Sequence, residues 1–201
     1  MKFSLANFFR KSEMQNVVAV NADATDYTQN DHEFRFVFND PVHTEKDGCL
    51  ISFGSLQECK LSETLTIYQN EKPSVKLDFH YKYASSRTQL AIKFNRFVAV
   101  GFSGYFFLYD LSTGTVVLFI DFRGYFNDFE TYNGHLFVTY NAGIYCLTNY
   151  GVIKWHNSNV GIDGVLITEV KEDKVYGSEQ IDPPDGWKDF ILDLETGQRS
   201  S

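Results

Sequence analysis

A glycine-anchored pattern recurs three times between residue 88 and the C-terminus, and this repetition constrains the fold more than any other feature. Each copy has an apolar run, a turn, a second apolar run that ends in a glycine turn, and a further run. The anchor glycines, Gly114, Gly151 and Gly197, are spaced 37 and 46 residues apart. Recurrence at this period is typical of repeat folds, in which each copy forms one supersecondary unit.

Each copy is preceded by a further candidate strand, at 89–94, 126–132 and 165–170. Four short strands per unit at this spacing indicate a propeller blade. The second interval is longer because 180–186, which contains Asp-Pro-Pro-Asp-Gly, has the composition of an inserted loop. A β-sandwich is the alternative, since short strands at regular spacing also fit that fold.

Period-two alternation also marks strands before the repeats. Phe34, Phe36 and Phe38 share one side of a run, and apolar and polar residues alternate from Val75 to Tyr83. Pro73 follows Asn70 in a predicted turn. The elements predicted before residue 88 are a short amphipathic helix at 5–14, strands at 17–20, 34–38, 49–53, 64–68 and 75–83, and turns at 40–41, 46–48 and 70–73.

The composition agrees with a fold built of strands. The chain holds 19 Phe and 12 Tyr, and aromatic side chains fit pleated, half-buried surfaces. We therefore predict an all-β protein that forms a partial or open β-propeller-like array of antiparallel four-stranded blades, because three repeats are fewer than a closed propeller needs. Residues 1–87 form a β-rich segment that packs on the three repeats of 88–201, in one continuous domain.

The charge of the chain limits its partners. The net charge of −8 repels phosphate backbones, which argues against nucleic-acid binding and favours basic partners. Residues 163–195 hold ten acidic residues and three lysines, a net charge of −7. Two interpretations stand: the acids fill the solvent faces of the last strands, or they form an acidic binding face.

No catalytic or metal-binding motif is present, so we expect no enzyme activity, metal or cofactor. Residues 101–104, Gly-Phe-Ser-Gly, lack the spacing of a nucleophile elbow and indicate a hairpin turn. The five histidines, including His135 and His156 in strand patterns, lack metal-ligand spacing. The three cysteines form no CxxC pair, and Cys146 is predicted to be a buried thiol. Without a signal-peptide core or membrane span, the expected compartment is the cytoplasm.

The strongest candidate for a contact site is Trp187, which follows the proline-stiffened loop and lies between Asp185 and Asp189. An aromatic side chain among acids predicts a protein-binding hot spot. The alternative is that Trp187 packs between blades. Asp182, Asp185 and Asp189 could also provide general acid–base catalysis, although aspartate in such a turn commonly bonds the local backbone. The predicted partner-binding residues are Asp163, Glu179, Asp182, Asp185, Trp187 and Asp189.

Residues 161–165, 182–190 and 194–197 resemble a group of small bacterial propeller-like proteins, and 107–114 fits the same pattern. The resemblance covers the repeats and leaves 1–87 without a counterpart. In size, acidity and single-domain form, the chain is similar to the immunity proteins of contact-dependent growth-inhibition systems.

This resemblance implies a cytoplasmic protein that binds its cognate toxin domain one-to-one and blocks the active site. The implied toxin is a basic nuclease, which an acidic inhibitor would attract by electrostatic steering. Two alternatives remain: a propeller-type protein-interaction scaffold in another assembly, and a hydrolase that uses Asp182, Asp185 or Asp189. No nucleic-acid or membrane partner is expected.

Overall fold

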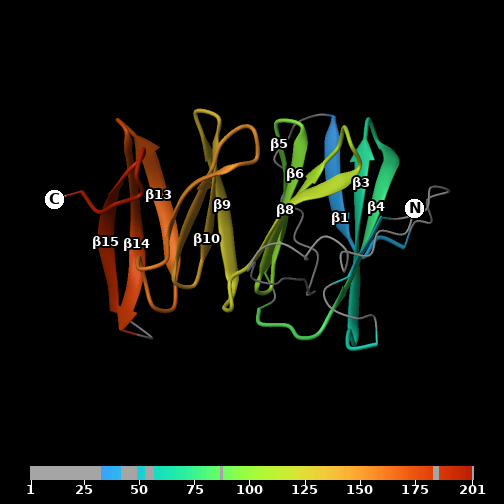
Figure 1. The fold of residues 1–201 in the computed structure, drawn as a ribbon, viewed down its shortest axis with the longest axis horizontal. Helices are drawn as coiled ribbons and strands as arrows, with labels where there is room; N and C mark the ends of the chain where they lie inside the picture. Colours follow the sequence, from blue (N-terminus) through green and yellow to red (C-terminus); the bar gives the residue numbers. More distant parts are fainter. Residues whose placement is uncertain (1–32, 42–48, 53–56, 87, 183–185, 201) are drawn as a thin grey trace, which may run out of the picture. The chain divides into compact units, whose positions relative to one another are not determined.

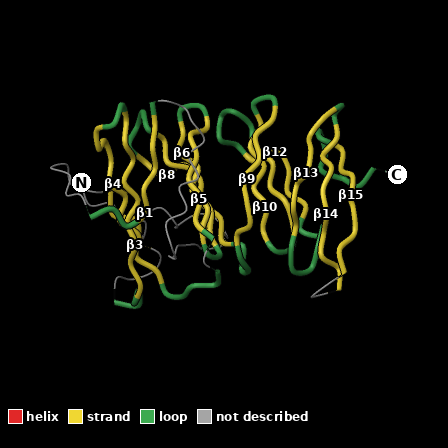
Figure 2. The backbone as a smooth tube through the Cα atoms, turned by 180° about the vertical axis from the view of Figure 1, so that it is seen from behind, coloured by secondary structure: helices red, strands yellow, loops and turns green. Residues whose placement is uncertain are grey.

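The computed structural model describes residues 33–41, 49–52, 57–86, 88–182 and 186–200, which form strands joined by loops (Figures 1 and 2). The chain divides into two compact units, Met1–Arg123 and Gly124–Ser201. The described part contains no helix that is long and apolar enough to cross a membrane. The predicted helix at 5–14, strand at 17–20 and turn at 46–48 lie outside the described residues.

The first unit contains two four-stranded sheets. Sheet 1 has the order β1-β3-β4-β2, with β2 parallel to β4 and the other pairs antiparallel. Sheet 2 is an antiparallel meander in the order β5-β6-β7-β8. The strands are β1 Phe34–Phe38, β2 Cys49–Ser52, β3 Leu61–Gln69, β4 Lys72–Tyr81, β5 Gln89–Phe94, β6 Phe97–Phe102, β7 Tyr105–Asp110 and β8 Thr115–Asp121.

Sheets 1 and 2 share one hydrophobic core, in which side chains of β3 and β4 meet those of β6 and β7. Phe79 of β4 lies against Phe102 and Phe107 of sheet 2, with ring centroids 5.3 Å and 5.2 Å apart. The predicted alternation holds along β4, but the strand ends at Tyr81 and leaves Tyr83 exposed. The boundary predicted after residue 87 therefore lies inside the first unit, between its two sheets.

The turn between β3 and β4 is shorter than predicted. Only Asn70 and Glu71 form it, both with positive φ, at 49° and 60°. Two consecutive positive φ values define the tight turn whose twist matches that of the flanking strands. Pro73, predicted to lie in the turn, is the second residue of β4 and pairs with Tyr68 at a register shift, where it is tolerated.

The second unit also contains two sheets, both antiparallel meanders. Sheet 3 has the order β12-β11-β10-β9, and sheet 4 has three strands in the order β13-β14-β15. A single bridge between Leu192 and Arg199 starts a fourth strand beside β15. The strands are β9 Phe126–Tyr132, β10 His135–Tyr140, β11 Gly143–Leu147, β12 Ile153–Asn157, β13 Val165–Lys171, β14 Lys174–Asp182 and β15 Gly186–Asp193.

Two of the three glycine turns, those at Gly114 and Gly197, have a physical basis in the aspartate that precedes them. One carboxylate oxygen of Asp193 accepts hydrogen bonds from the backbone N–H and hydroxyl of Thr196, at 2.8 Å each. Gly197 then closes the turn by donating its N–H to the Asp193 carbonyl, with φ of 68°. In sheet 2 the Asp110 carboxylate accepts the N–H and hydroxyl of Ser112 instead, and Gly114 donates its N–H to the Asp110 carbonyl with the same φ.

The predicted fold class is confirmed. In sheets 2, 3 and 4 every strand pairs with its neighbour in sequence, as in a propeller blade. A Greek-key sandwich would place strands that are distant in sequence side by side. The protein is therefore all-β and β-propeller-like, with antiparallel blades of four strands in sheets 2 and 3. The third blade departs from the predicted four strands, because sheet 4 has three.

Candidate functional site

Sheet 4 has two faces that differ in burial. Val175, Gly177 and Phe190 point to one face, which packs on sheet 3 around Phe137 and Cys146 in a shared core. We call this the inner face. The predicted buried thiol is confirmed, since Cys146 is fully buried, and burial raises the pKa of its thiol to about 12.

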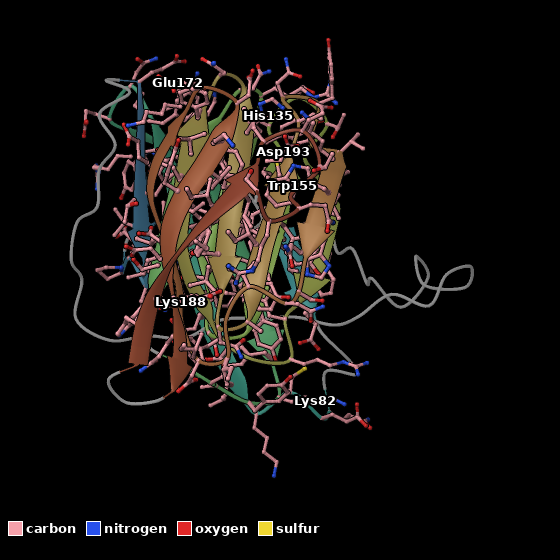
Figure 3. All side chains as sticks on the ribbon, turned by 90° about the vertical axis from the view of Figure 1, so that its left-hand side faces the viewer. Lys82, His135, Trp155, Glu172, Lys188 and Asp193 are labelled. Atoms are coloured by element: carbon pink, nitrogen blue, oxygen red, sulfur yellow. The ribbon has the colours of Figure 1, made fainter. Side chains whose placement is uncertain are left out.

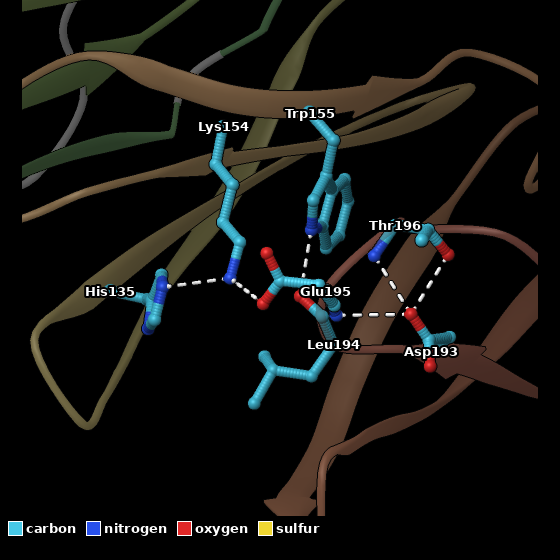
Figure 4. Close-up of polar contacts among 7 residues, drawn as sticks. All are labelled: His135, Lys154, Trp155, Asp193, Leu194, Glu195 and Thr196. Atoms are coloured by element: carbon cyan, nitrogen blue, oxygen red, sulfur yellow. Dashed lines mark hydrogen bonds and ion pairs between the residues drawn. The ribbon is translucent and has the colours of Figure 1, made fainter.

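A group of polar contacts joins sheet 3 to the glycine turn of sheet 4 (Figure 4). The Lys154 ammonium lies 2.6 Å from a Glu195 carboxylate oxygen and 3.3 Å from Nε2 of His135. The indole N–H of Trp155 donates to the Leu194 carbonyl at 2.9 Å. These contacts hold the turn after β15 against β12. His135 takes part in them through Lys154.

The ring of Trp155 also covers Gly197. A Cβ atom added to Gly197 would lie 2.4 Å from the Trp155 ring, which is far inside van der Waals contact. The side-chain amide of Asn157 donates to the Gly197 carbonyl at 2.8 Å. Gly197 is therefore required both by its positive φ and by the closeness of Trp155.

The opposite face of sheet 4 carries a mixed group of exposed apolar and polar side chains. Trp187 and Ile191 remain 46% and 40% exposed on β15, and Leu166 remains 44% exposed on β13. Figure 3 looks onto sheet 4, where Lys188 lies near the start of β15 and Asp193 is its last residue. We define the outer face of sheet 4 by six residues: Leu166, Tyr176, Ser178, Trp187, Asp189 and Ile191.

Trp187 is held in place while its ring stays half-exposed. A Cβ atom on Gly164 would lie 2.9 Å from the outer edge of the Trp187 ring, so the ring rests on the backbone of that glycine. The position between sheets 3 and 4 is occupied by Trp155. Of the two interpretations of Trp187, the structure places its ring on the outer face, where it is available for contact.

Asp163 lies next to this ring, because it precedes Gly164 in the same loop. It is exposed, and the Tyr125 hydroxyl donates to its carbonyl and approaches its carboxylate at 3.0 Å. Burial, together with the bond to Asp163, raises the pKa of Tyr125 to about 12. The structure thus brings two of the predicted partner-binding residues, Asp163 and Trp187, together around Gly164.

Asp189 is also exposed, two residues beyond Trp187 on the same face, where its carboxylate accepts the Ser178 hydroxyl at 2.8 Å. Asp182 pairs with Gly186 at the end of the β14–β15 hairpin, so its backbone is placed at the edge of the predicted site. Asp185 lies outside the described residues.

Glu179 is not part of this surface. It is only 2% exposed and forms an ion pair with Arg199, which also donates to the Val160 carbonyl at 3.1 Å. The physical reason is the period of the strand, because Glu179 alternates with Val175 and Gly177 on the inner face. Its carboxylate is directed into the protein, and its contacts are structural.

Four of the ten acidic residues between residues 163 and 195 form ion pairs or turn hydrogen bonds. Glu169 lies 2.6 Å from the Lys171 ammonium, and Glu195 and Glu179 pair with Lys154 and Arg199. Hydrogen bonds from the turn hold Asp193 and lower the pKa of its carboxyl. Asp163 and Asp189 remain exposed beside Trp187.

The sequence analysis did not select the apolar residues of this face. Leu166, Tyr176 and Ile191 lie on it, and Ile191 shares the period-two side of β15 with Trp187 and Asp189. Strand alternation was the signal that could have identified Ile191. Leu166 and Tyr176 required the pairing register, which is a tertiary property.

A second cluster of chemically versatile side chains lies in sheet 3. The Tyr140 hydroxyl is 2.8 Å from Nε2 of His156, and the Tyr145 ring stacks on that imidazole with centroids 3.8 Å apart. Loss of solvation lowers the pKa of His156 and raises that of Tyr140, so both are neutral near pH 7. Among the described residues, no three His, Cys, Asp or Glu side chains gather as a metal site would require.

Comparison with known proteins adds little beyond this geometry. No family model matches the chain, and no curated protein matches it. Among solved structures, the computationally designed Ika4 protein is similar at 12% identity with a TM-score of 0.43, over 59% of this chain and 75% of that one.

Two natural proteins give comparable values. BamB from Moraxella catarrhalis is 15% identical with a TM-score of 0.44, over 69% of this chain and 42% of that one. The Neurospora crassa Pan2 WD40 domain is 10% identical with a TM-score of 0.42, over 69% and 45%. The chain thus spans less than half the length of both. Because the TM-scores are below 0.5, no function is inferred for this chain from these similarities.

Proposed function

We propose that this chain is a non-catalytic protein-interaction module of the propeller type, and that its partner binds the outer face of sheet 4. The observation that supports this most directly is Trp187, whose ring is positioned by Gly164 and yet 46% exposed. An ordered, half-exposed tryptophan loses little conformational entropy on binding, which is why such side chains dominate interface energetics.

The surroundings of Trp187 favour a basic protein surface as the partner. Exposed Leu166 and Ile191 provide apolar area, while Asp163 and Asp189 provide negative charge at its border. Charge at the rim of an interface mainly speeds association and selects the partner, and apolar anchors at the centre slow dissociation. A binding site of this composition would select a basic protein domain with an apolar centre.

We further propose that this partner is a cognate toxin domain, which would make the chain an immunity protein that blocks its target by occupying the active site. The support is the sequence resemblance of the repeats, together with the acids that remain exposed beside Trp187. A basic nuclease domain fits this surface, because enzymes that act on phosphate backbones carry positive charge at their substrate site.

A pull-down of the tagged chain from cells that express the neighbouring reading frames tests both the interaction module and the immunity protein. Mass spectrometry is the readout. Recovery of one basic toxin domain in one-to-one ratio supports the immunity proposal. Recovery of a different protein supports the interaction module and contradicts the toxin. If nothing is recovered, the interaction proposal fails and the hydrolase alternative, with Asp189 on the outer face, takes its place.

Substitutions then locate the binding face. We expect Trp187→Ala to weaken partner binding by at least about 30-fold, the equivalent of a hot spot of about 2 kcal/mol. Tyr150→Ala is the matched control, since Tyr150 is an exposed aromatic residue of the β11–β12 turn, away from the outer face. Equal effects of the two substitutions would place the interface elsewhere.

The charge contribution has its own pair of variants. We expect Asp189→Lys to slow association with a basic partner and to reduce the dependence of the association rate on salt. Glu130→Lys, at an exposed position of sheet 3, changes the net charge by the same amount outside the face. If both variants slow association equally, overall charge rather than the outer face attracts the partner.

A further inference from the structure

The blades differ in how far the last strand extends. In sheet 2, β8 pairs with β7 along its whole length, from Tyr105 to Asp110. In sheet 3, β12 likewise pairs with β11 from Ile144 to Leu147. In sheet 4 the segment after Gly197 makes one bridge, Leu192 to Arg199, beside the final residues of β15.

The backbone hydrogen bonds of β15 show which of its groups face the edge away from β14. The Ile191 carbonyl accepts from the Ser200 N–H, and the Asp193 N–H donates to the Gln198 carbonyl, so both residues direct their backbone groups away from β14. Backbone groups alternate in direction along a strand, so Asp189 and Trp187 direct theirs to the same edge. Among the described residues, no backbone hydrogen bond is made at that edge by Trp187 or Asp189.

We propose that this edge accepts an extended segment of the partner as an added antiparallel strand, which completes the blade of sheet 4 beyond Arg199. Unpaired N–H and C=O groups on an edge strand are a template for such addition, and backbone bonds supply affinity while alternate side chains supply specificity. This proposal deepens the proposed function, on which the existence of a protein partner rests.

The side chains beside the edge define the chemistry of that segment. A residue paired with Asp189 or Trp187 would project onto the outer face, beside a carboxylate and an indole, and a basic residue with an aliphatic stem suits both. A residue paired with Lys188 would project to the opposite side, where a second positive charge is disfavoured. The segment would therefore alternate basic and uncharged residues.

Amide hydrogen exchange of the free protein gives the first test. We expect the amides of Trp187 and Asp189 to exchange rapidly, and those of Lys188 and Phe190, which are directed at β14, to be protected. Protection of Trp187 and Asp189 in the free protein would overturn the proposal. The dependence of this protection on protein concentration would then show whether a second copy or another part of the same chain covers the edge.

The second test adds a probe. We expect the peptide acetyl-Lys-Val-Lys-Val-Lys-Val-amide at millimolar concentration to slow exchange at Trp187 and Asp189 and to shift their amide resonances. The same peptide with glutamate in place of lysine is the control, and it should leave both amides unchanged. No effect of the lysine peptide, or equal effects of both peptides, would overturn the proposed basic strand.

Once the partner is identified, Asp189→Pro distinguishes binding at this edge from binding at the outer face. Proline removes the outward N–H and leaves the β14–β15 ladder intact, whereas Phe190→Pro removes a ladder bond and should lower the melting temperature strongly. We expect Asp189→Pro to reduce partner binding at least tenfold, and Asp189→Ala, which keeps the N–H, to reduce it less.

The two proposals fail in different ways. Unchanged binding by Asp189→Pro, together with lost binding by Trp187→Ala, would overturn the added strand and retain the outer face. The reverse result would retain the added strand and overturn the face.

Discussion

The closeness of Trp155 to Gly197 leads to a specific expectation for Gly197→Ala. A left-handed backbone costs a residue with a Cβ atom about 1–2 kcal/mol. At Gly197 the added methyl group would also overlap the Trp155 ring at 2.4 Å, and forced overpacking costs about 1–3 kcal/mol more. We therefore expect Gly197→Ala to lower the free energy of unfolding by about 2–5 kcal/mol.

Gly134 offers a matched control in the same unit. Its φ is 74°, close to the 68° of Gly197, but an added Cβ would lie 3.8 Å from the nearest atom, an ordinary contact. Gly134→Ala should therefore show the backbone cost alone, about 1–2 kcal/mol. The two variants differ in the contact with Trp155 and share the backbone conformation.

Urea unfolding followed by tryptophan fluorescence measures both effects, since Trp155 and Trp187, the two tryptophans of the chain, lie in the second unit. A double-mutant cycle completes the test. In a Trp155→Leu background, Gly197→Ala should cost no more than Gly134→Ala, because the ring that it meets is gone. Equal costs of the two alanine variants in the wild-type background would refute the packing described for Trp155.

Three further outcomes follow from the structure. Trp155→Ala should lower the free energy of unfolding by about 3–5 kcal/mol, because the Trp155 side chain is only 8% exposed. Trp187→Ala should lower it by clearly less, because Trp187 is 46% exposed; urea titration measures both free energies. Asp193→Asn should reduce stability at pH 6 and have less effect at pH 3. Hydrogen bonds from Thr196 lower the folded-state pKa of Asp193, so its carboxylate stabilises the fold above its unfolded-state pKa, and this contribution is lost as the pH falls through the folded value; thermal melts across this range test it. Iodoacetamide should modify Cys146 only after unfolding, since this thiol is buried and its pKa is raised to about 12. Cys59 is partly exposed and should react in the native protein; peptide mass mapping distinguishes the two thiols.

Local pattern was sufficient to predict most of the strands. The alternation of residues 75–81 and the three glycine turns depend on neighbours in sequence, and the structure confirms them. At Gly114 and Gly197 the preceding aspartate accounts for the recurrence of the turn, since its carboxylate accepts hydrogen bonds from the turn residues. These features need no knowledge of which strands pair.

Features that depend on pairing were missed. The parallel placement of β2 beside β4 joins strands that are distant in sequence, and no local pattern predicts it. Glu179 was assigned to the binding surface from charge alone, but its burial depends on the strand period and on Arg199, 20 residues away. The apolar part of the candidate site was missed because charge, rather than alternation, guided the selection of its residues.

The meander of sheets 2, 3 and 4 also bears on how the chain reaches its fold. Each strand pairs with the next one along the chain, and several of these hairpins turn through two residues, as at Asn133–Gly134 and Glu172–Asp173. Short loop closures make such contacts local, which favours rapid folding for a β protein. Each blade can therefore assemble soon after its last strand leaves the ribosome, whereas sheet 1 must wait for β4 before β2 has a neighbour.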